Sequence, residues 1–157
     1  MAVENLDRII CEHPVFHGLG DQPCLLISGC AKNVRFEKGE YLCREGESAD
    51  WFYLLRAGSV ALEMAAPAKG VLTFQSLHEG ELVGVSWLLP PYRWGYDARA
   101  TERVRAVAMD ARCLRAKIED DHELGFQLMM RFTPILVERL HGTRLQLLDV
   151  YAPAARA

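Results

Sequence analysis

The sequence predicts a mainly β protein with flanking helices: an antiparallel β jelly roll that follows two N-terminal helices and precedes a long C-terminal helix. Between residues 34 and 109, short apolar or alternating segments are separated by turns that contain glycine, such as Lys38-Gly39 and Glu79-Gly80. Short strands with regular turn signals are typical of a jelly roll. On both sides of this region the apolar residues recur at helical spacing instead.

The composition indicates one cytoplasmic domain. The chain has 157 residues, half of them hydrophobic, which is enough for a single core. Its formal charge is −3 and it has no long basic block, which speaks against binding of nucleic acid. The N-terminal segment lacks an apolar run long enough for a signal peptide, and no segment approaches the length of a membrane span.

The cysteines form an odd count without a C-x-x-C pair: Cys11, Cys24, Cys30, Cys43 and Cys113. This pattern argues against a disulfide framework and fits a reducing compartment. We therefore expect most of these side chains to be buried thiols.

Taken in order, the elements divide the chain into N-terminal helices (1–32), a jelly roll (33–109), C-terminal helices (110–151) and a tail (152–157). The first two helices are predicted over residues 6–16, with a break at Pro14, and 22–31, where Pro23 suits a first helical turn. Seven strands are predicted over residues 33–36, 41–43, 51–56, 59–64, 72–77, 98–101 and 104–109.

Helices resume after Asp110. Residues 111–119 predict a short helix, and Asp120 with Glu123 forms a capping-box-like pair that opens a long helix ending near Tyr151. Pro134 is expected to kink or locally break this long helix.

The long helix carries a broad apolar face. Steps of three and four connect Met129, Phe132, Leu136, Leu140, Thr143, Leu147 and Tyr151, and the stripe is widened by Val137, Arg144 and Leu148. Such a face can cover the barrel with one edge and meet the same helix of a second copy with the other, which predicts a homodimer. A helix packed only on its own barrel is the alternative.

Several motifs at matching spacing carry a family resemblance. They are His13-Pro14-Val15-Phe16, Phe36-Glu37-Lys38-Gly39-Glu40-Tyr41, Arg44-Glu45-Gly46-Glu47, Asp50-Trp51-Phe52-Tyr53-Leu54-Leu55, Gly58-Ser59-Val60 and Gly80-Glu81-Leu82-Val83-Gly84. With them, nearly the whole chain resembles the cyclic nucleotide-binding domain of catabolite activator (Crp-Fnr-like) and protein kinase A regulatory proteins. The resemblance implies a signalling domain that binds a ligand such as cyclic AMP.

The resemblance also implies a phosphate-binding cassette within residues 80–100. The family holds the cyclic phosphate with the N–H groups of a short helix and an arginine, and the ribose with a glutamate. Gly84, Val85 and Ser86 would supply the cassette backbone, but Val85 occupies the position of the glutamate and Trp94 that of the arginine. Neither side chain can make the family's contact.

Arg93 and Arg99 are the candidate replacements for the missing charge, with a solvated loop residue as the alternative for Arg93. Trp94 and the nearby aromatic side chains can fill the pocket by packing, which we favour, or can stack on a flat ligand. On the long helix, the resemblance places Thr143 and Arg144 at the base of the nucleotide. The alternative for the Thr143 hydroxyl is a bond to the preceding helical turn.

Other kinds of site are not indicated. A metal-dependent jelly-roll enzyme needs convergent ligands, but His13, His17, His78, His122 and His141 are scattered. Related regulators can carry an iron–sulfur cluster, for which Cys24 and Cys30 with Cys11 are weak candidates because a separation of six on a helix faces different sides. No serine has an identifiable base partner, so we predict neither catalysis nor a metal site.

The predicted function is a stand-alone regulatory domain that senses a small anionic ligand, a cyclic nucleotide or an analogue, and signals through its C-terminal helix to an unknown protein partner. The alternative is a ligand-independent dimerisation or protein-interaction module with an aromatic-filled pocket. The family's transcription factors continue into a helix-turn-helix domain, whereas this chain stops at Ala157, so direct DNA binding is not expected. No membrane partner is expected either.

Overall fold

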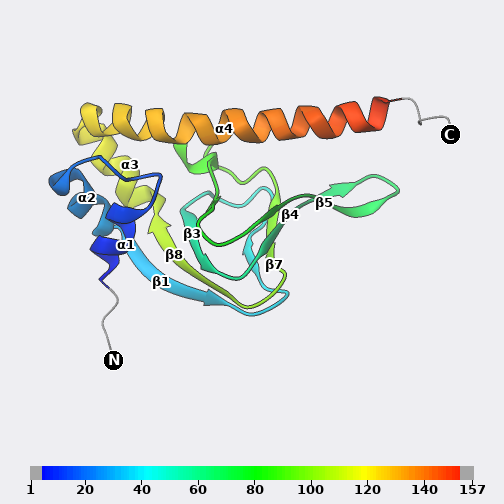
Figure 1. Ribbon diagram of the computed structural model, residues 1–157, viewed down its shortest axis with the longest axis horizontal. Coiled ribbons are helices and arrows are strands. Elements are labelled where there is room, and N and C mark those ends of the chain that lie inside the picture. The colour runs from blue at the N-terminus through cyan, green and yellow to red at the C-terminus, as the bar shows by residue number, and fades with distance from the viewer. Residues whose placement is uncertain (1–4, 153–157) are drawn as a thin grey trace.

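The computed structural model describes residues 5–152, in which two β-sheets are flanked by helices (Figure 1). Two helices come first, α1 (Leu6–Glu12) and α2 (Asp21–Ser28). The strands are β1 (Ala31–Phe36), β2 (Tyr41–Cys43), β3 (Trp51–Ala57), β4 (Val60–Ala66), β5 (Gly70–Leu77), β6 (Leu82–Val83), β7 (Asp97–Ala100) and β8 (Val104–Asp110). A 3-10 turn, η1 (Ser86–Leu88), lies between β6 and β7, and α3 (Ala111–Asp120) and α4 (His122–Tyr151) follow the strands.

The two sheets are antiparallel and have the strand orders β1-β8-β3-β6 and β2-β7-β4-β5. Strands distant in the chain therefore pair, as in β1 with β8 and β2 with β7, which is the connectivity expected of a jelly roll. The predicted fold class is confirmed. All seven predicted strands are present with ends within two residues of the prediction. β6 and η1 were missed because a pair of apolar residues and a single 3-10 turn have no readable period.

The core lies between the sheets and beneath the helices. Ala98 and Ala100 of β7 and Leu62 of β4 are fully buried, and Leu62 pairs with Ala98 across the sheet. Burying a side chain such as that of Leu62 stabilises the fold by about 1.5–3 kcal/mol. The Tyr53 hydroxyl donates to the Leu42 carbonyl at 3.1 Å, which ties β3 of one sheet to β2 of the other.

Gly58 permits the tight turn between β3 and β4. Its φ is +87°, and a Cβ added there would lie 2.2 Å from the carbonyl oxygen of Arg103. A larger residue would have to displace the backbone of the turn between β7 and β8, so this position requires glycine.

The N-terminal helices are shorter than predicted. The Asn5 side chain caps α1 by accepting from the backbone N–H groups of Asp7 and Arg8, and the helix ends at Glu12 because His13 precedes Pro14 and takes an extended conformation. Helix α2 ends at Ser28, and Ala31, which the sequence assigned to that helix, begins β1.

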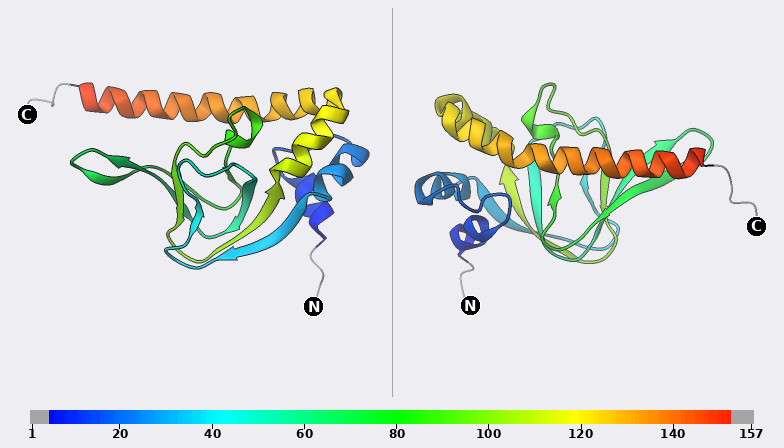
Figure 2. Two further views of the ribbon diagram at one scale, coloured as in Figure 1. Left: turned by 180° about the vertical axis from the view of Figure 1, so that it is seen from behind. Right: turned by 45° about the horizontal axis from the view of Figure 1, so that its top comes forward.

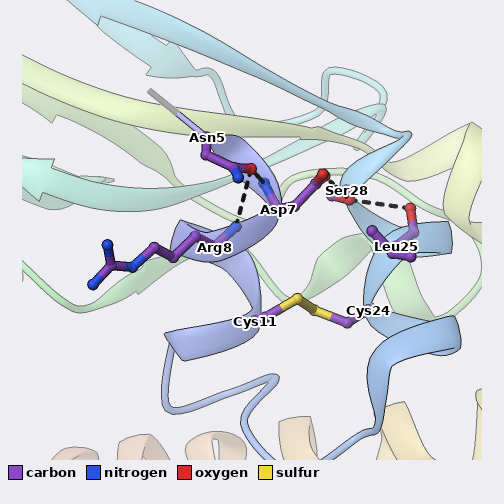
Figure 3. Close-up of a disulfide and its surroundings, with 7 residues drawn as sticks. All are labelled: Asn5, Asp7, Arg8, Cys11, Cys24, Leu25 and Ser28. Atoms are coloured by element: carbon purple, nitrogen blue, oxygen red, sulfur yellow. Dashed lines mark hydrogen bonds between the residues drawn. A yellow bond between two sulfur atoms is a disulfide. The ribbon is translucent and has the colours of Figure 1, made fainter. Parts of the chain in front are cut away.

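The expectation of unpaired cysteines was wrong. Cys11 of α1 is bonded to Cys24 of α2 (Figure 3), and Cys30 is bonded to Cys113 of α3, with Cα–Cα distances of 5.6 and 5.8 Å. Only Cys43 is a free, buried thiol among the described residues. Both pairs join different elements, so sequence spacing could not show them, and the argument for a reducing compartment loses its support.

Helix α4 extends along the molecule, over the N-terminal helices at one end and over the β4–β5 hairpin at the other (Figures 1 and 2). Its cap is Asp121, which accepts from the Leu124 N–H, and not the predicted Asp120. The helix continues through Pro134 without the predicted break, and the Thr133 hydroxyl donates to the Met129 carbonyl at 2.6 Å. The tail that begins at residue 152 lies, beyond its first residue, outside the described residues.

We predict that breaking the Cys30–Cys113 bond lowers stability strongly, because it closes a loop with a sequence separation of 83 residues. Cys30→Ala should reduce the free energy of unfolding by about 4–5 kcal/mol on the loop-entropy scale, measured by urea denaturation without reductant. Cys113→Ala should cost about the same, and the double variant little more, because all three lack the same bond. A loss below about 1 kcal/mol would contradict this prediction.

Candidate functional site

The segment predicted to contain the cassette comprises β6, β7 and the connection between them, which we call the β6–β7 segment (residues 84–96). Gly84 has a φ of +108°, Val85 precedes the 3-10 turn, and Ser86 begins it. Gly84, Val85 and Ser86 therefore lie together at the position that the sequence analysis gave to the cassette backbone. Backbone hydrogen bonds connect this segment to the 44–49 turn. In one of them, the Trp94 N–H donates to the Glu47 carbonyl at 2.9 Å.

The Trp94 indole occupies the interior of this segment. Its exposed fraction is 5%, and a Cβ added to Gly84 would lie 2.3 Å from Cη2 and 2.8 Å from Cζ3 of the ring. The edge of the ring meets Tyr96 at a centroid distance of 5.9 Å. Glycine at position 84 thus permits the indole to lie directly on the backbone, where the sequence analysis expected packing to replace a phosphate.

Trp87, the other buried tryptophan of the segment, belongs to the core under α4. Its ring stacks on Phe52 with centroids 4.6 Å apart and an interplanar angle of 8°. It also meets Phe132 of α4 edge to face at 5.3 Å. These three rings fix the segment to both β3 and α4.

Arg93 points to the outside. It is exposed, and its Nη1 donates to the Gly46 carbonyl at 2.8 Å. Ser48 and Arg93 form an isolated β-bridge, so the neighbouring Trp94 side chain points to the opposite side. The backbone at Arg93 and Trp94 therefore lies between the Arg93 side chain and the interior.

Arg99 is committed to another partner. Its Nε and Nη2 donate to Oε1 of Glu63 at 2.9 and 2.6 Å, and Glu63 is almost fully buried. The hydrogen bond and the charge of Glu63 raise the pKa of Arg99 above its usual value. Because Ala98 and Ala100 on either side point into the core, Arg99 lies on the outer face of the sheet.

A cavity of about 390 Å³ lies between α4 and the barrel. Its wall comes from four parts of the chain: residues 13–15, Phe74 and Gln75 of β5, residues 80–82, and residues of α4. The α4 residues are Ile135, Glu138, Arg139, Gly142, Thr143 and Gln146. The Gln146 amide donates to the Phe74 carbonyl at 2.7 Å, which closes the end of the cavity near the β4–β5 hairpin.

Thr143 lines this cavity, whereas Arg144 is exposed and does not. The Thr143 hydroxyl donates to the carbonyl of Arg139 at 2.9 Å, which is the bond to the preceding turn that the sequence analysis kept as its alternative. The hydroxyl oxygen still has an acceptor lone pair for a ligand.

Arg139 is the cation of the cavity, and the sequence analysis missed it. Its Nη2 donates to the carbonyl of Leu82 in β6. Its Nη1 is buried and has no hydrogen-bond partner among the described residues, and the same holds for the Tyr96 hydroxyl. Arg139 lies one helical turn before Thr143, so the 3.6-residue period could have placed both side chains on one face.

Arg139 and Tyr96 also interact electrostatically. Burial raises the pKa of Tyr96 to about 12, against the opposing effects of the positive charge of Arg139 and of a close polar contact with the Arg139 side chain. The phenol is therefore a neutral donor at physiological pH.

His13 closes the opposite rim of the cavity. Its Nδ1 accepts from the Val15 N–H at 3.2 Å, and its Nε2 lies 3.1 Å from the Gly80 carbonyl, so the proton is assigned to Nε2. Burial lowers the pKa of His13, while the hydrogen bond to Gly80 opposes this effect. Because Nδ1 accepts a hydrogen bond, it carries no proton, so the positive charge among the lining residues comes from Arg139, alongside the carboxylates of Glu81 and Glu138.

Neither a metal site nor a membrane-spanning helix is found in residues 5–152. Within them, no three histidine, cysteine, aspartate or glutamate side chains converge as metal ligands would. None of the helices in this range combines the length and the apolar composition that a membrane crossing requires.

The family follows from the sequence. Residues 33–121, more than half of the chain, match the sequence model of the family described as "Cyclic nucleotide-binding domain". The chain therefore belongs to the cyclic nucleotide-binding domain family, as its motifs indicated.

Known relatives agree with this membership. The CRP-like cAMP-activated global transcriptional regulator of Mycobacterium tuberculosis is 26% identical over 145 residues, which are 92% of this chain and 63% of the relative. Among solved structures, a cyclic nucleotide-binding domain from Methylobacillus flagellatus KT has a TM-score of 0.78 at 15% identity, covering 96% of this chain and 85% of that one. The catabolite activator protein of Thermus thermophilus has a TM-score of 0.69 at 23% identity, with coverages of 88% and 63%.

We predict that Trp94 and Gly84 form one packing unit. Trp94→Ala should cost about 3–5 kcal/mol of unfolding free energy, because it empties a buried indole site. Gly84→Ala should cost about 2 kcal/mol more than Gly39→Ala, its matched control, because Gly39 has a φ of +92° but open space around its Cα.

In the Trp94→Ala background, Gly84→Ala should cost little more than Gly39→Ala, because its main steric conflict is gone. Chemical denaturation of the six proteins completes the cycle. A neutral Trp94→Ala variant would show that the ring does not fill the interior.

Proposed function

We propose that this chain is a regulatory domain that senses a small anionic ligand, a cyclic nucleotide or an analogue, in the cavity between the barrel and α4. Membership of the cyclic nucleotide-binding domain family supports the ligand class. The observation that carries the proposal for this site is Arg139, which lines the cavity and whose buried Nη1 finds no carbonyl or carboxylate acceptor among the described residues, only the nearby Tyr96 hydroxyl. A buried guanidinium group is costly unless its donors are satisfied, and a ligand oxyanion would satisfy them.

In this proposal the charge of the ligand is paired by Arg139 and not by Arg93 or Arg99. Those two side chains already donate to Gly46 and Glu63 and lie on outer surfaces. The Thr143 hydroxyl would accept from the flat part of the ligand. The backbone of Gly84, Val85 and Ser86 would support the site indirectly, because Trp94 separates it from the cavity.

The proposed signal begins at the same arginine. Arg139 of α4 now donates to Leu82 of β6, so an anion that attracts the guanidinium group would compete with this link between helix and barrel. The position of α4 would then depend on the ligand, within the limit set by the difference in ligand affinity between the two positions. The output partner would be another protein that reads α4.

The first test is a calorimetric titration of nucleotide-free protein with cyclic AMP and cyclic GMP. We expect binding near the micromolar range for one of them, which corresponds to about −8 kcal/mol. Arg139→Gln should weaken it about 10- to 150-fold, the effect of one charge-assisted hydrogen bond. Arg144→Gln is the matched control on the same helix, since Arg144 is exposed and lies outside the cavity wall, and it should bind normally.

A second candidate function is a ligand-independent interaction module, favoured by the packing of Trp94 onto Gly84. If the wild type gives no heat at millimolar nucleotide, this candidate is supported and the ligand proposal fails. The double variant Val85→Glu/Trp94→Arg, which supplies the residue types that the family resemblance implies, then shows whether the frame accepts a nucleotide once the indole is removed.

Both candidates include a homodimer formed through α4. The side of the helix turned away from the barrel exposes Met130, Val137, Leu140, Leu147, Leu148 and Tyr151, and Val137 is 60% exposed. Met130, Val137 and Tyr151 are spaced by multiples of seven, with Leu140 and Leu147 three residues after heptad positions, which is the pattern of a paired helix seam.

We predict a mass of twice 17.7 kDa by sedimentation equilibrium at micromolar concentration. Val137→Glu combined with Leu147→Glu should shift the dimer to monomer, because opposed carboxylates in a helix seam repel. Leu26→Glu, a change of the same kind on the exposed surface of α2, should leave the mass unchanged. A wild-type monomer across the concentration range would overturn the prediction.

A further inference from the structure

The Cys11–Cys24 disulfide closes the loop between α1 and α2. The two Cα atoms are 5.6 Å apart, and the sequence separation is 13 residues. Figure 3 shows the bond bridging the two helices at one end, while a hydrogen bond from the Ser28 hydroxyl to the Asp7 carboxylate joins them at the other. One covalent bond thus holds both ends of the loop 12–23, which comprises the connection between α1 and α2 and the helix residues next to it.

This loop is part of the candidate ligand site. His13, Pro14 and Val15 line the cavity, and the His13 ring is hydrogen-bonded to the Gly80 carbonyl on the other side of the rim. A change in the freedom of the loop therefore changes one wall of the cavity.

The same loop also holds α4. Arg131 of α4 donates from Nη1 to the carbonyl of His17 at 2.6 Å. The Phe16 ring lies 6.3 Å from that of Phe132, a tilted contact within the core. The disulfide therefore restrains a segment that connects the cavity rim to the helix proposed to carry the signal.

The disulfide borders open space. A cavity of about 340 Å³ is lined by Cys11 and Cys24 together with Glu12, Phe16 and the loop residues 17–21. Cys11 is the more exposed of the two partners. Thiol–disulfide exchange requires that a thiolate reach one sulfur, and this cavity offers the approach.

We propose that the Cys11–Cys24 disulfide is a redox modification site, cleaved and re-formed by a dithiol, whose state sets how firmly the loop 12–23 closes the ligand cavity and holds α4. Its effect on ligand binding rests on the function proposed above. Its effect on the loop and on α4 does not.

The exchange is a two-electron reaction. A thiolate of the dithiol attacks Sγ of Cys11 and forms a mixed disulfide, and Sγ of Cys24 leaves as a thiolate and takes up a proton. The second thiol of the reagent, as a thiolate, then attacks the mixed disulfide, and Cys11 is released and protonated. The protein gains two electrons and two protons, while the dithiol is oxidised to its own disulfide.

Reduction should loosen the loop but leave the helices in place. The Ser28–Asp7 hydrogen bond remains, and Ile10 of α1 and Ile27 of α2 are fully buried in the core. At the Cys30–Cys113 disulfide, by contrast, the neighbouring backbone does not depend on the bond for its position. The N–H of Asp110 donates to the Cys30 carbonyl at 2.7 Å and Ala31 pairs with Met109, so the backbone beside that bond is held by the sheet.

The test compares hydrogen exchange in the oxidised protein and in protein treated with millimolar dithiothreitol, with alkylation and mass spectrometry to identify the reduced cysteines. We expect Cys11 and Cys24 to be alkylated first and exchange to rise about tenfold in residues 13–20 and near Arg131. Cys11→Ser/Cys24→Ser should reproduce this change without reductant. Cys30→Ser/Cys113→Ser is the matched control: its predicted loss of global stability should raise exchange in the core, but should leave the faster exchange by local opening of residues 13–20 unchanged.

If one of the cyclic nucleotides binds, reduction should weaken its affinity about tenfold, a coupling of ordinary size. If neither binds, the exchange experiment still decides whether the bond controls the loop. The proposal is overturned if the native Cys11–Cys24 bond resists the dithiol, or if its reduction leaves exchange in the loop and near Arg131 unchanged.

Discussion

The contact between the Trp94 indole and the backbone of Gly84 is the constraint around which the rest of the site is arranged. A ring of this size can approach so closely only because residue 84 has no side chain. Because the indole fills the interior of the β6–β7 segment, the proposed anion site is placed elsewhere. A partly buried cation lies instead on α4, where Arg139 reaches the barrel at Leu82. In the proposed site the charged group therefore comes from the helix and not from the sheet.

The sequence predicted those parts of the fold whose residues follow a regular pattern. Strands bounded by glycine turns, the long helix and the family motifs all lie where they were predicted. The packing of Trp94 was also predicted, because it followed from a residue type that cannot pair with phosphate. These inferences depend on local period or on the chemistry of one residue, and both are readable in a linear chain.

The parts that were missed depend on contacts between distant segments. Cys24 and Cys30 were assigned to one helix, yet the chain leaves α2 at Ser28, and each cysteine meets a partner from another element. Arg99 was a candidate for ligand binding because its pairing with the buried Glu63, 36 residues away in the chain, cannot be seen in the sequence. Arg139 was overlooked because a charged residue on an amphipathic helix is ordinarily solvated. Tertiary pairing decided each of these outcomes.

Pro134 gives α4 a mechanical property that a regular helix would not have. Proline has no N–H to donate to the carbonyl four residues earlier, so the ladder of hydrogen bonds is one rung short in the middle of an otherwise continuous helix. The turns before it are fixed by Leu124, Leu128 and Phe132, which are buried, whereas the exposed apolar stripe lies mostly after it. The second half of the helix is held to the barrel by side-chain contacts such as those of Arg139 with Leu82 and Gln146 with Phe74. A ligand or partner that displaced these contacts would therefore meet less resistance to bending α4 at Pro134 than in a helix with a complete set of backbone hydrogen bonds.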